Sequence, residues 1–159
     1  MADIIGDGNE AWWWLPSVAN IASVTTAEFT GGIRISQWMT KDGATGFQPD
    51  TADAPTSGKE STFDTATNGR ISFSSPRLTF KKQDGTDTVF NTLTQNATGY
   101  LARRNSMPAT TAVASAQKLE VYPVICSATA RVDQDDNQPE KIMVPVKITA
   151  APNLRSVVA

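Results

Sequence analysis

The sequence predicts a mainly β fold in which one short amphipathic helix packs on a sheet. Several runs alternate apolar and polar residues with the two-residue period of a strand, most clearly from Glu140 to Ala150. Turn-forming residues separate these runs, and beyond a single turn only residues 86–96 have helical spacing. The chain of 159 residues is 40% hydrophobic and 19% charged. It is long enough to bury a core, so we expect a single domain over residues 1–159.

The block Trp12-Trp13-Trp14-Leu15, stopped by Pro16, predicts a short strand that is buried on both faces. Because neighbouring side chains of a strand point to opposite faces, an isolated surface cannot hide all three indoles. The block is therefore expected to pack against another element of the chain or against another chain.

Residues Thr25 to Glu28 match the capping box, in which a hydroxyl and a carboxylate each accept a backbone N–H at a helix start. Gly31-Gly32 then ends the helix after about one turn. Ile33 and Ile35 alternate with polar neighbours, which predicts a strand with one solvent-exposed face.

Residues 40–68 are rich in Gly, Pro, Asp, Thr, Ser and Ala, and their only large apolar side chains are Phe47 and Phe63. Such a stretch has little to place in a core, so we expect a long loop or an extended hairpin. Loops longer than about 12 to 15 residues are uncommon in a compact domain unless they are functional or disordered. The stretch is therefore either an arm that a partner orders or a mobile excursion.

Ile71 and Phe73 have one parity along the chain, whereas Leu78 and Phe80 have the other. This change predicts a long strand or strand pair with a bend or bulge at Ser75-Pro76. A helix should follow. A Thr or Asp at 86–87 can cap it, and it would run to about residue 96.

The side of this helix that carries Val89, Phe90 and Leu93 is expected to pack on the sheet. Residues 100–104 then predict a further strand.

The clearest β signal is a hairpin made by Leu119 to Val132 and Glu140 to Ala150 around the polar turn 133–139. In its second strand, apolar residues at 142, 144, 146 and 148 give one dry face and one wet face. Pro145 has no N–H to donate to a ladder, which favours a sheet edge or a bulge there.

The composition excludes much catalytic chemistry. The chain has no His and one Cys, so it cannot build a Ser-His-Asp or Cys-His site or a His-ligated metal. Cys126 lies in an apolar run and is expected to be a buried, inert thiol. A carboxylate-only hydrolase would need two closely placed acids, but most acids lie in predicted loops. We therefore expect no enzyme, no cofactor and no metal site.

The start of the chain lacks the basic segment and apolar core of a signal peptide. No run approaches the ~18 apolar residues of a membrane span. We expect a protein that is made in a cytoplasm, stays soluble until it assembles, and has no membrane partner.

The charges are unevenly distributed along the chain. Residues 1–64 carry nine acids and three bases, a net charge of −6, whereas residues 65–159 carry seven acids and eleven bases, a net charge of +4. Either the two parts interleave in one fold and cancel, or they meet in a head-to-tail contact between copies. The total of −2 argues against nucleic-acid binding through phosphate neutralisation.

A series of motifs extends over nearly the whole chain, each loose by itself and specific through its order and spacing. They are the aromatic-rich first strand ending in Leu15-Pro16, Val18 to Ala22, Thr25 to Phe29 with Gly31-Gly32, Asp87 to Leu93, Gly99 to Arg104, and Val121 to Val124 before a polar hairpin. In this series the chain resembles the major tail (tail tube) proteins of long-tailed bacteriophages, especially those of actinobacterial siphophages.

The resemblance implies a β-sandwich or half-barrel with one flanking α-helix, similar also to the type VI secretion tube protein. It implies a structural virion protein whose hexameric rings stack into a tube around the tape-measure protein. Tail tip or initiation proteins and a terminator protein would be further partners. DNA would pass through the tube during ejection without sequence-specific binding.

By the same analogy, ring and stack contacts are expected from the first strand, the 40–68 arm and a basic pair. The candidates are Trp12, Trp13, Trp14, Lys41, Phe47, Asp50, Lys59, Phe63, Arg103 and Arg104. The lumen is expected to be polar and preferably acidic, because a phosphate-attracting wall would retard DNA. Glu120, on the polar parity of its strand, is the lumen candidate.

Two other functions fit parts of the sequence. A carbohydrate-binding β-sandwich would use Trp12 to Trp14 and Trp38 as a stacking platform for sugar rings. Another virion protein, such as a tail terminator or a capsid decoration protein, would form closed rings or trimers that never elongate.

Overall fold

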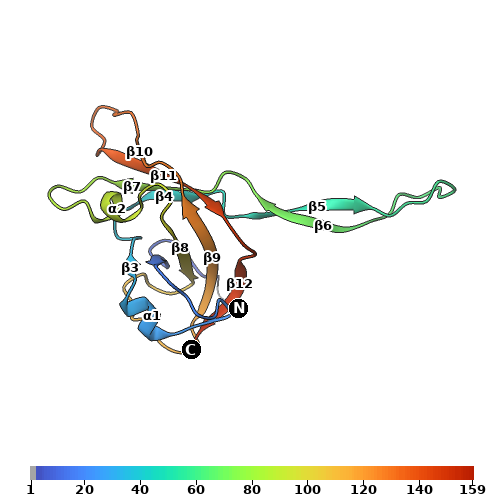
Figure 1. Cartoon of the computed structure of the whole chain (residues 1–159), viewed down its shortest axis with the longest axis horizontal. Coiled ribbons are helices and arrows are strands. Elements are labelled where there is room, and N and C mark those ends of the chain that lie inside the picture. The colour runs from blue at the N-terminus through green and yellow to red at the C-terminus, as the bar shows by residue number, and fades with distance from the viewer. Residues whose placement is uncertain (1–2) are drawn as a thin grey trace.

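The computed structural model describes residues 3–159, which form twelve strands and two short helices. Figure 1 shows a β-rich body from which a long two-stranded arm, β5 and β6, extends to one side. The bounds are β1 Glu10–Leu15, β2 Ser23–Val24, α1 Thr26–Thr30, β3 Ile33–Arg34, β4 Met39–Thr45, β5 Pro49–Pro55, β6 Ala66–Phe73, β7 Arg77–Lys81, α2 Thr88–Thr92, β8 Thr98–Asn105, β9 Lys118–Cys126, β10 Ala130–Arg131, β11 Lys141–Ile148 and β12 Asn153–Val158.

A ten-stranded sheet forms the body. Its main order is β3-β1-β8-β9-β11-β7-β4, with antiparallel neighbours throughout; β10 pairs with β11, and β12 lies between β9 and β2. β11 and β12 follow one another along the same edge of β9: Val124 lies opposite Ile148, and Leu119 lies opposite Ser156. The sheet curls around β9 into a half-barrel (Figure 1). The mainly β fold class is confirmed.

β1 has a hydrophobic core on each of its faces. Trp12 and Trp14 lie in a core with Phe80, whereas Trp13 and Leu15 lie in the other. The three indoles are at most 6% exposed. The prediction of a strand buried on both faces is confirmed, and the elements that cover it belong to the same chain.

The capping box at the start of α1 is also confirmed. Glu28 N donates to Thr25 Oγ1 at 3.4 Å, and Thr25 N donates to the Glu28 carboxylate at 2.6 Å. Ala19 N donates to the same carboxylate at 2.6 Å. Burial raises the pKa of Glu28, but the hydrogen bonds outweigh it and the net pKa is lowered. This carboxylate thus ties the helix to the preceding loop.

The second helix is shorter than the sequence predicts. Asp87 caps it by accepting a hydrogen bond from Phe90 N at 3.3 Å, but α2 ends at Thr92 rather than near residue 96. Val89 and Leu93, four residues apart, share the buried face. Phe90 points elsewhere and is 41% exposed, so the expectation that it packs on the sheet is wrong.

The structure decides whether residues 40–68 form a long loop or an extended hairpin. Met39–Thr45 is strand β4 of the body, with Ala44 opposite Leu78. The following residues form the β5–β6 hairpin, which continues to Phe73. The stretch is therefore an extended hairpin, whose root lies further along the chain than residue 40.

The predicted bend at Ser75-Pro76 marks the return from the arm to the body. Ser75 has φ +48°, β6 ends before it, and β7 begins after it. Leu78 is fully buried in the body, whereas Ile71 on the arm is 65% exposed. The change of parity thus coincides with a change of sheet.

The terminal hairpin has the predicted dry face, because positions 142, 144 and 146 are buried. β9 and β10 both pair with β11, with Cys126 opposite Val146 and Ala130 opposite Met143. Pro145 lies where the pairing of β11 with β9 ends and its pairing with β10 has not yet begun. On that edge of β11 no backbone N–H is needed at this position. The prediction of an irregularity at this proline is confirmed.

Candidate functional site

The arm is the candidate site for contacts with another molecule. β5 and β6 pair with each other, with Thr51 opposite Ile71 and Ala54 opposite Thr67, and with no other strand that the structure describes. Nearly all of their side chains are exposed. Since a lone two-stranded hairpin is at best marginally stable in water, a surface that covers the arm would stabilise it.

Hydrogen bonds hold the tip of the arm in shape. Thr56 Oγ1 donates to Thr65 Oγ1 at 2.8 Å, and Thr65 N donates to Ser57 Oγ at 2.7 Å. Ser61 Oγ donates to the carbonyl of Phe63 at 2.6 Å. The ring of Phe63 is nevertheless 76% exposed. The tip thus presents an aromatic side chain to solvent.

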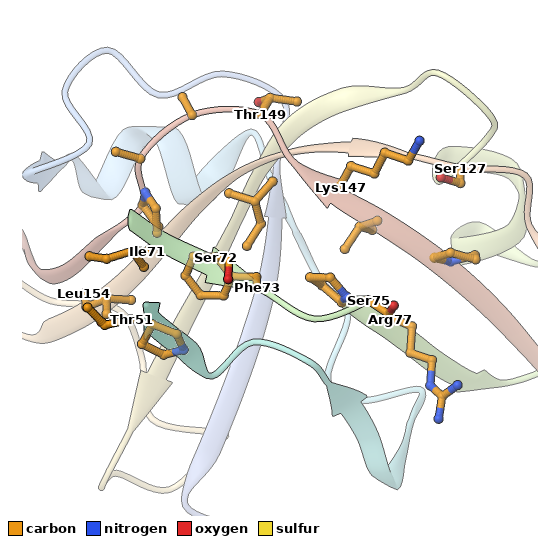
Figure 2. Close-up of a pocket in the computed structure, with 18 of the residues that line it drawn as sticks. Thr51, Ile71, Ser72, Phe73, Ser75, Arg77, Ser127, Lys147, Thr149 and Leu154 are labelled. Carbon is orange, nitrogen blue, oxygen red and sulfur yellow. The ribbon is translucent and has the colours of Figure 1, made fainter. Parts of the chain in front are cut away.

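A groove of about 980 Å³ lies where the arm joins the body. Figure 2 shows Ile71 and Phe73 of the arm together with Leu154 of β12 among the side chains that line it. Ile71 and Leu154 are 65% and 40% exposed. Among the described residues of the lining, the charged side chains are Arg77 and Lys147, both basic. The groove is therefore apolar with a basic margin.

An ionic network closes one end of the core that holds Trp12. Arg103 Nε donates to Glu10 at 3.0 Å, Arg103 Nη1 donates to Glu120 at 3.4 Å, and the guanidinium lies 5.4 Å from the Trp12 ring centroid. Tyr122 Oη donates to Glu120 at 2.8 Å. Burial lowers the pKa of Arg103, but the two carboxylates outweigh it and raise the net pKa. Burial is the largest cause that raises the pKa of Tyr122, and the hydrogen bond to Glu120 raises it further.

Arg104 points to the other face of β8 and is fully buried. Nη1 donates to Gln117 Oε1 at 2.9 Å, and Nη2 donates to the carbonyls of Thr111 and Pro108 at 2.8 and 3.1 Å. The guanidinium lies 5.1 Å from the centroid of Trp13. No acid of the described chain pairs with it, and burial lowers its pKa. Arg104 thus anchors the loop between β8 and β9.

The interface candidates from the sequence fall into two groups. Lys41, Asp50, Lys59 and Phe63 are exposed, the last three on the arm. The second group lies within the subunit and consists of Trp12, Trp13, Trp14, Phe47 and Arg104, which are buried, and Arg103, which is half-buried in the network. Burial by the same chain removes the reason for assigning this second group to a contact between copies.

The carbohydrate platform is wrong for Trp12 to Trp14, because these side chains are buried and present no ring face to a sugar. Their burial also accounts for the apolar block without a ligand.

Sequence reasoning missed the groove. Ile71 has the parity pattern of a core residue, yet its strand is flanked by β5 alone and its side chain is exposed. The signal that could have found it is its surroundings: Ala66 to Arg70 holds no other large apolar residue. Leu154 comes from a strand distant in sequence, so no local pattern joins it to Ile71.

Cys126 is buried, and burial raises the pKa of its thiol to about 11. Within residues 3–159, no group of three or more Cys, Asp or Glu side chains gathers as a metal site. The helices that the structure describes are too short to cross a membrane.

A family model described as phage tail tube protein matches residues 1–159. None of the curated proteins matches the chain. Among solved structures, the fold is similar to a chain in the cryo-EM structure of the anti-feeding prophage (AFP) baseplate, 6-fold symmetrised. The TM-score is 0.61 at 8% sequence identity, over 97% of this chain and 99% of that chain. At this identity the likeness concerns the fold.

Proposed function

Because the chain belongs to the phage tail tube protein family, we propose that its copies close into hexameric rings that stack into the tail tube. The tube surrounds the tape-measure protein and conducts DNA into the host during ejection. Proteins of this family are structural components of the virion tail and are not enzymes. The tail assembles from many such subunits. Tail tip or initiation proteins start the tube, and a terminator protein ends it. Synthesis takes place in the host cytoplasm, and actinobacterial siphophages are the setting we propose.

The observation that carries the proposal is the arm. It projects from the body (Figure 1), and within residues 3–159 its two strands pair only with each other. A contact that repeats between identical copies without closing joins two different surfaces of the chain, one from each copy. The arm offers one such surface, and the body offers room for the other.

Ring closure would also protect the ends of the sheet. β3 and β4 end the main strand order, so each has one side without a partner strand among the described residues. Unpaired strand edges invite pairing with other chains, and closed symmetric assemblies remove them. The sixfold symmetry of the particle that contains the similar chain supports six as the number of subunits.

Glu120 remains our candidate for the lumen. Together with Glu10 and Arg103 it forms a network with a net charge of −1, a sign that does not retain DNA. Glu120→Lys should slow ejection and lower infectivity, whereas Glu120→Gln, which keeps hydrogen-bonding capacity, should have the smaller effect. Full infectivity of the lysine variant in assembled virions would contradict a lumenal position.

Negative-stain electron microscopy of the purified protein across a concentration series tests the proposed function, with a tail-initiation complex added as a nucleus. We expect hollow tubes of uniform width with a regular axial repeat. Discrete particles at every concentration, with the nucleus present, would refute a tube. Closed rings or trimers that never elongate would instead indicate a terminator or decoration protein.

A further inference from the structure

We propose that the tip of the arm of one copy, with Phe63 as its anchor, binds in the groove at the arm root of another copy. This inference rests on the proposed assembly of copies and adds to it the two surfaces that meet. One surface consists of residues 56–65, and the other is the groove that Ile71 and Leu154 help to line.

Phe63 has the properties of an interface anchor. It is 76% exposed at the end of a protruding element, and hydrogen bonds within the tip hold the loop that carries it. A loop already held in shape loses little conformational entropy on binding. Buried aromatic residues that fill a pocket supply much of the free energy at protein interfaces.

The groove has matching properties. Its volume of about 980 Å³ exceeds what one ring fills, so it can take the tip with several of its side chains. Ile71 and Leu154 remain 65% and 40% exposed, which leaves apolar area for a partner to cover. Figure 2 shows that the arm itself supplies part of the lining through Thr51, Ile71 and Phe73.

The charges of the two surfaces are complementary. Arg77 and Lys147 lie at the groove, whose described lining contains no acid. At the tip, Glu60 and Asp64 flank Phe63 and outnumber Lys59. Acidic side chains around an aromatic anchor would thus face a basic margin around an apolar surface.

The length of the arm requires that the two surfaces come from different copies. From Phe73 to Ala66 strand β6 spans about 23 Å at ~3.3 Å per residue, and Phe63 lies beyond its far end in the tip loop. The same ribbon forms part of the groove, so its far end cannot turn back into that groove. A chain with the anchor at one end of the arm and the groove at the other makes a heterologous contact, which closes into a ring or repeats along a tube according to the rotation between neighbouring copies.

Residues 3–9 offer a competing occupant. Ile4 and Ile5 are 67% and 76% exposed. Gly8 O accepts a hydrogen bond from Ala109 N, which holds this segment against the loop between β8 and β9. We therefore favour the arm tip, and the experiment includes the segment as a rival.

Disulfide trapping tests the contact, because the natural Cys126 is buried and only the introduced thiols are accessible. Thr62→Cys, an exposed tip position that keeps the Phe63 ring, and Leu154→Cys are prepared as separate proteins, mixed under assembly conditions and oxidised. We expect a mixed disulfide between the two variants, identified by mass spectrometry. The pair Phe90→Cys with Leu154→Cys is the control for random collision, since Phe90 is also exposed. A stronger mixed disulfide between Ile5→Cys and Leu154→Cys would overturn the assignment in favour of residues 3–9.

The critical concentration for assembly provides a second measurement. Phe63→Ala should raise it about tenfold or more, as expected for loss of a buried aromatic ring, whereas Phe90→Ala should leave it unchanged. Wild-type tubes with no cross-link between Thr62→Cys and Leu154→Cys and a normal critical concentration for Phe63→Ala would overturn the docking but not the tube. Absence of wild-type tubes would refute the proposed function, and a mixed disulfide formed without them would still support the docking.

Discussion

Replacing Arg104 by Met should destabilise the subunit by about 2 to 4 kcal/mol. The guanidinium donates to Gln117 and to the carbonyls of Pro108, Thr111 and Ala112 at 2.8 to 3.4 Å. A hydrogen bond to a charged group contributes about 1.5 to 3 kcal/mol, and the acceptors lost here lie on half-buried or exposed residues, where water can replace part of each bond. Removing an unpaired buried cation returns several kcal/mol of desolvation free energy, which is why the expected net loss is less than the sum.

Urea unfolding followed by Trp fluorescence measures this effect, because Trp13 lies 5.1 Å from the guanidinium and is buried in the folded subunit. With a slope of about 2 kcal/mol/M, the midpoint should fall by about 1 to 2 M. Arg155→Met is the matched control: Arg155 is exposed, and its replacement should change the stability by less than about 0.5 kcal/mol.

The opposite result, no loss of stability in Arg104→Met, is physically possible, since replacing a buried charge by an apolar residue of similar volume is often neutral or stabilising. An Arg104→Met protein at least as stable as the wild type would show that the desolvation cost outweighs the four hydrogen bonds. The anchoring role that we assign to Arg104 would then be refuted.

Three further predictions concern the body. Thr25→Ala should lower the free energy of unfolding by about 1 kcal/mol through loss of the helix cap. Because the pKa of Glu28 is lowered in the folded state, the stability that its carboxylate contributes should be complete above the ordinary pKa of 4.5 and disappear as the pH falls through the folded pKa. Acid unfolding of Glu28→Gln should lack this loss of stability, and an acid transition identical to that of the wild type would contradict the assignment. Gly99→Ala should destabilise the subunit by about 1 to 3 kcal/mol, because the added Cβ would lie 2.6 Å from Trp14 Cζ2 and 2.9 Å from the carbonyl oxygen of Leu15. Gly58→Ala on the arm is the control, since its Cβ meets nothing within 4 Å and the melting temperature should not change. Equal melting temperatures of the two variants would show that β1 shifts freely. Cys126, whose pKa is raised to about 11, should react with a thiol reagent at pH 8 only after urea unfolding, and rapid labelling of the folded protein would disprove its burial.

Local features of the fold could be predicted where neighbouring residues decide the conformation. The capping box from Thr25 to Glu28 needs four consecutive residues and a backbone turn, and the bend at Ser75-Pro76 follows from a parity change visible within ten residues. The predicted length of α2 was wrong because the helical spacing of apolar residues at 89–93 does not show how far the core surface that buries them extends. The helix ends at Thr92, and the last buried residue is its C-cap, Leu93.

The candidate site was partly predictable. The polar composition of residues 40–68 indicated a long loop or an extended hairpin with Phe47 and Phe63 as its only large apolar side chains; the structure buries Phe47 in the core and leaves Phe63 exposed. The groove could not be found in the same way. It joins side chains from β6, β11 and β12, and their proximity depends on the curl of the sheet around β9.

The sequence alone determined which residues need burial, where the chain turns and which residues cannot enter a core, because these properties belong to side chains and their nearest neighbours. Three adjacent indoles required cover on both faces of a strand, and the tertiary structure decided that two cores of the same chain provide it. It also decided that Ile71, with the pattern of a core residue, lies exposed beside a groove. Burial depends on which distant segments meet, and strand pairing over long separations is not encoded in any local pattern.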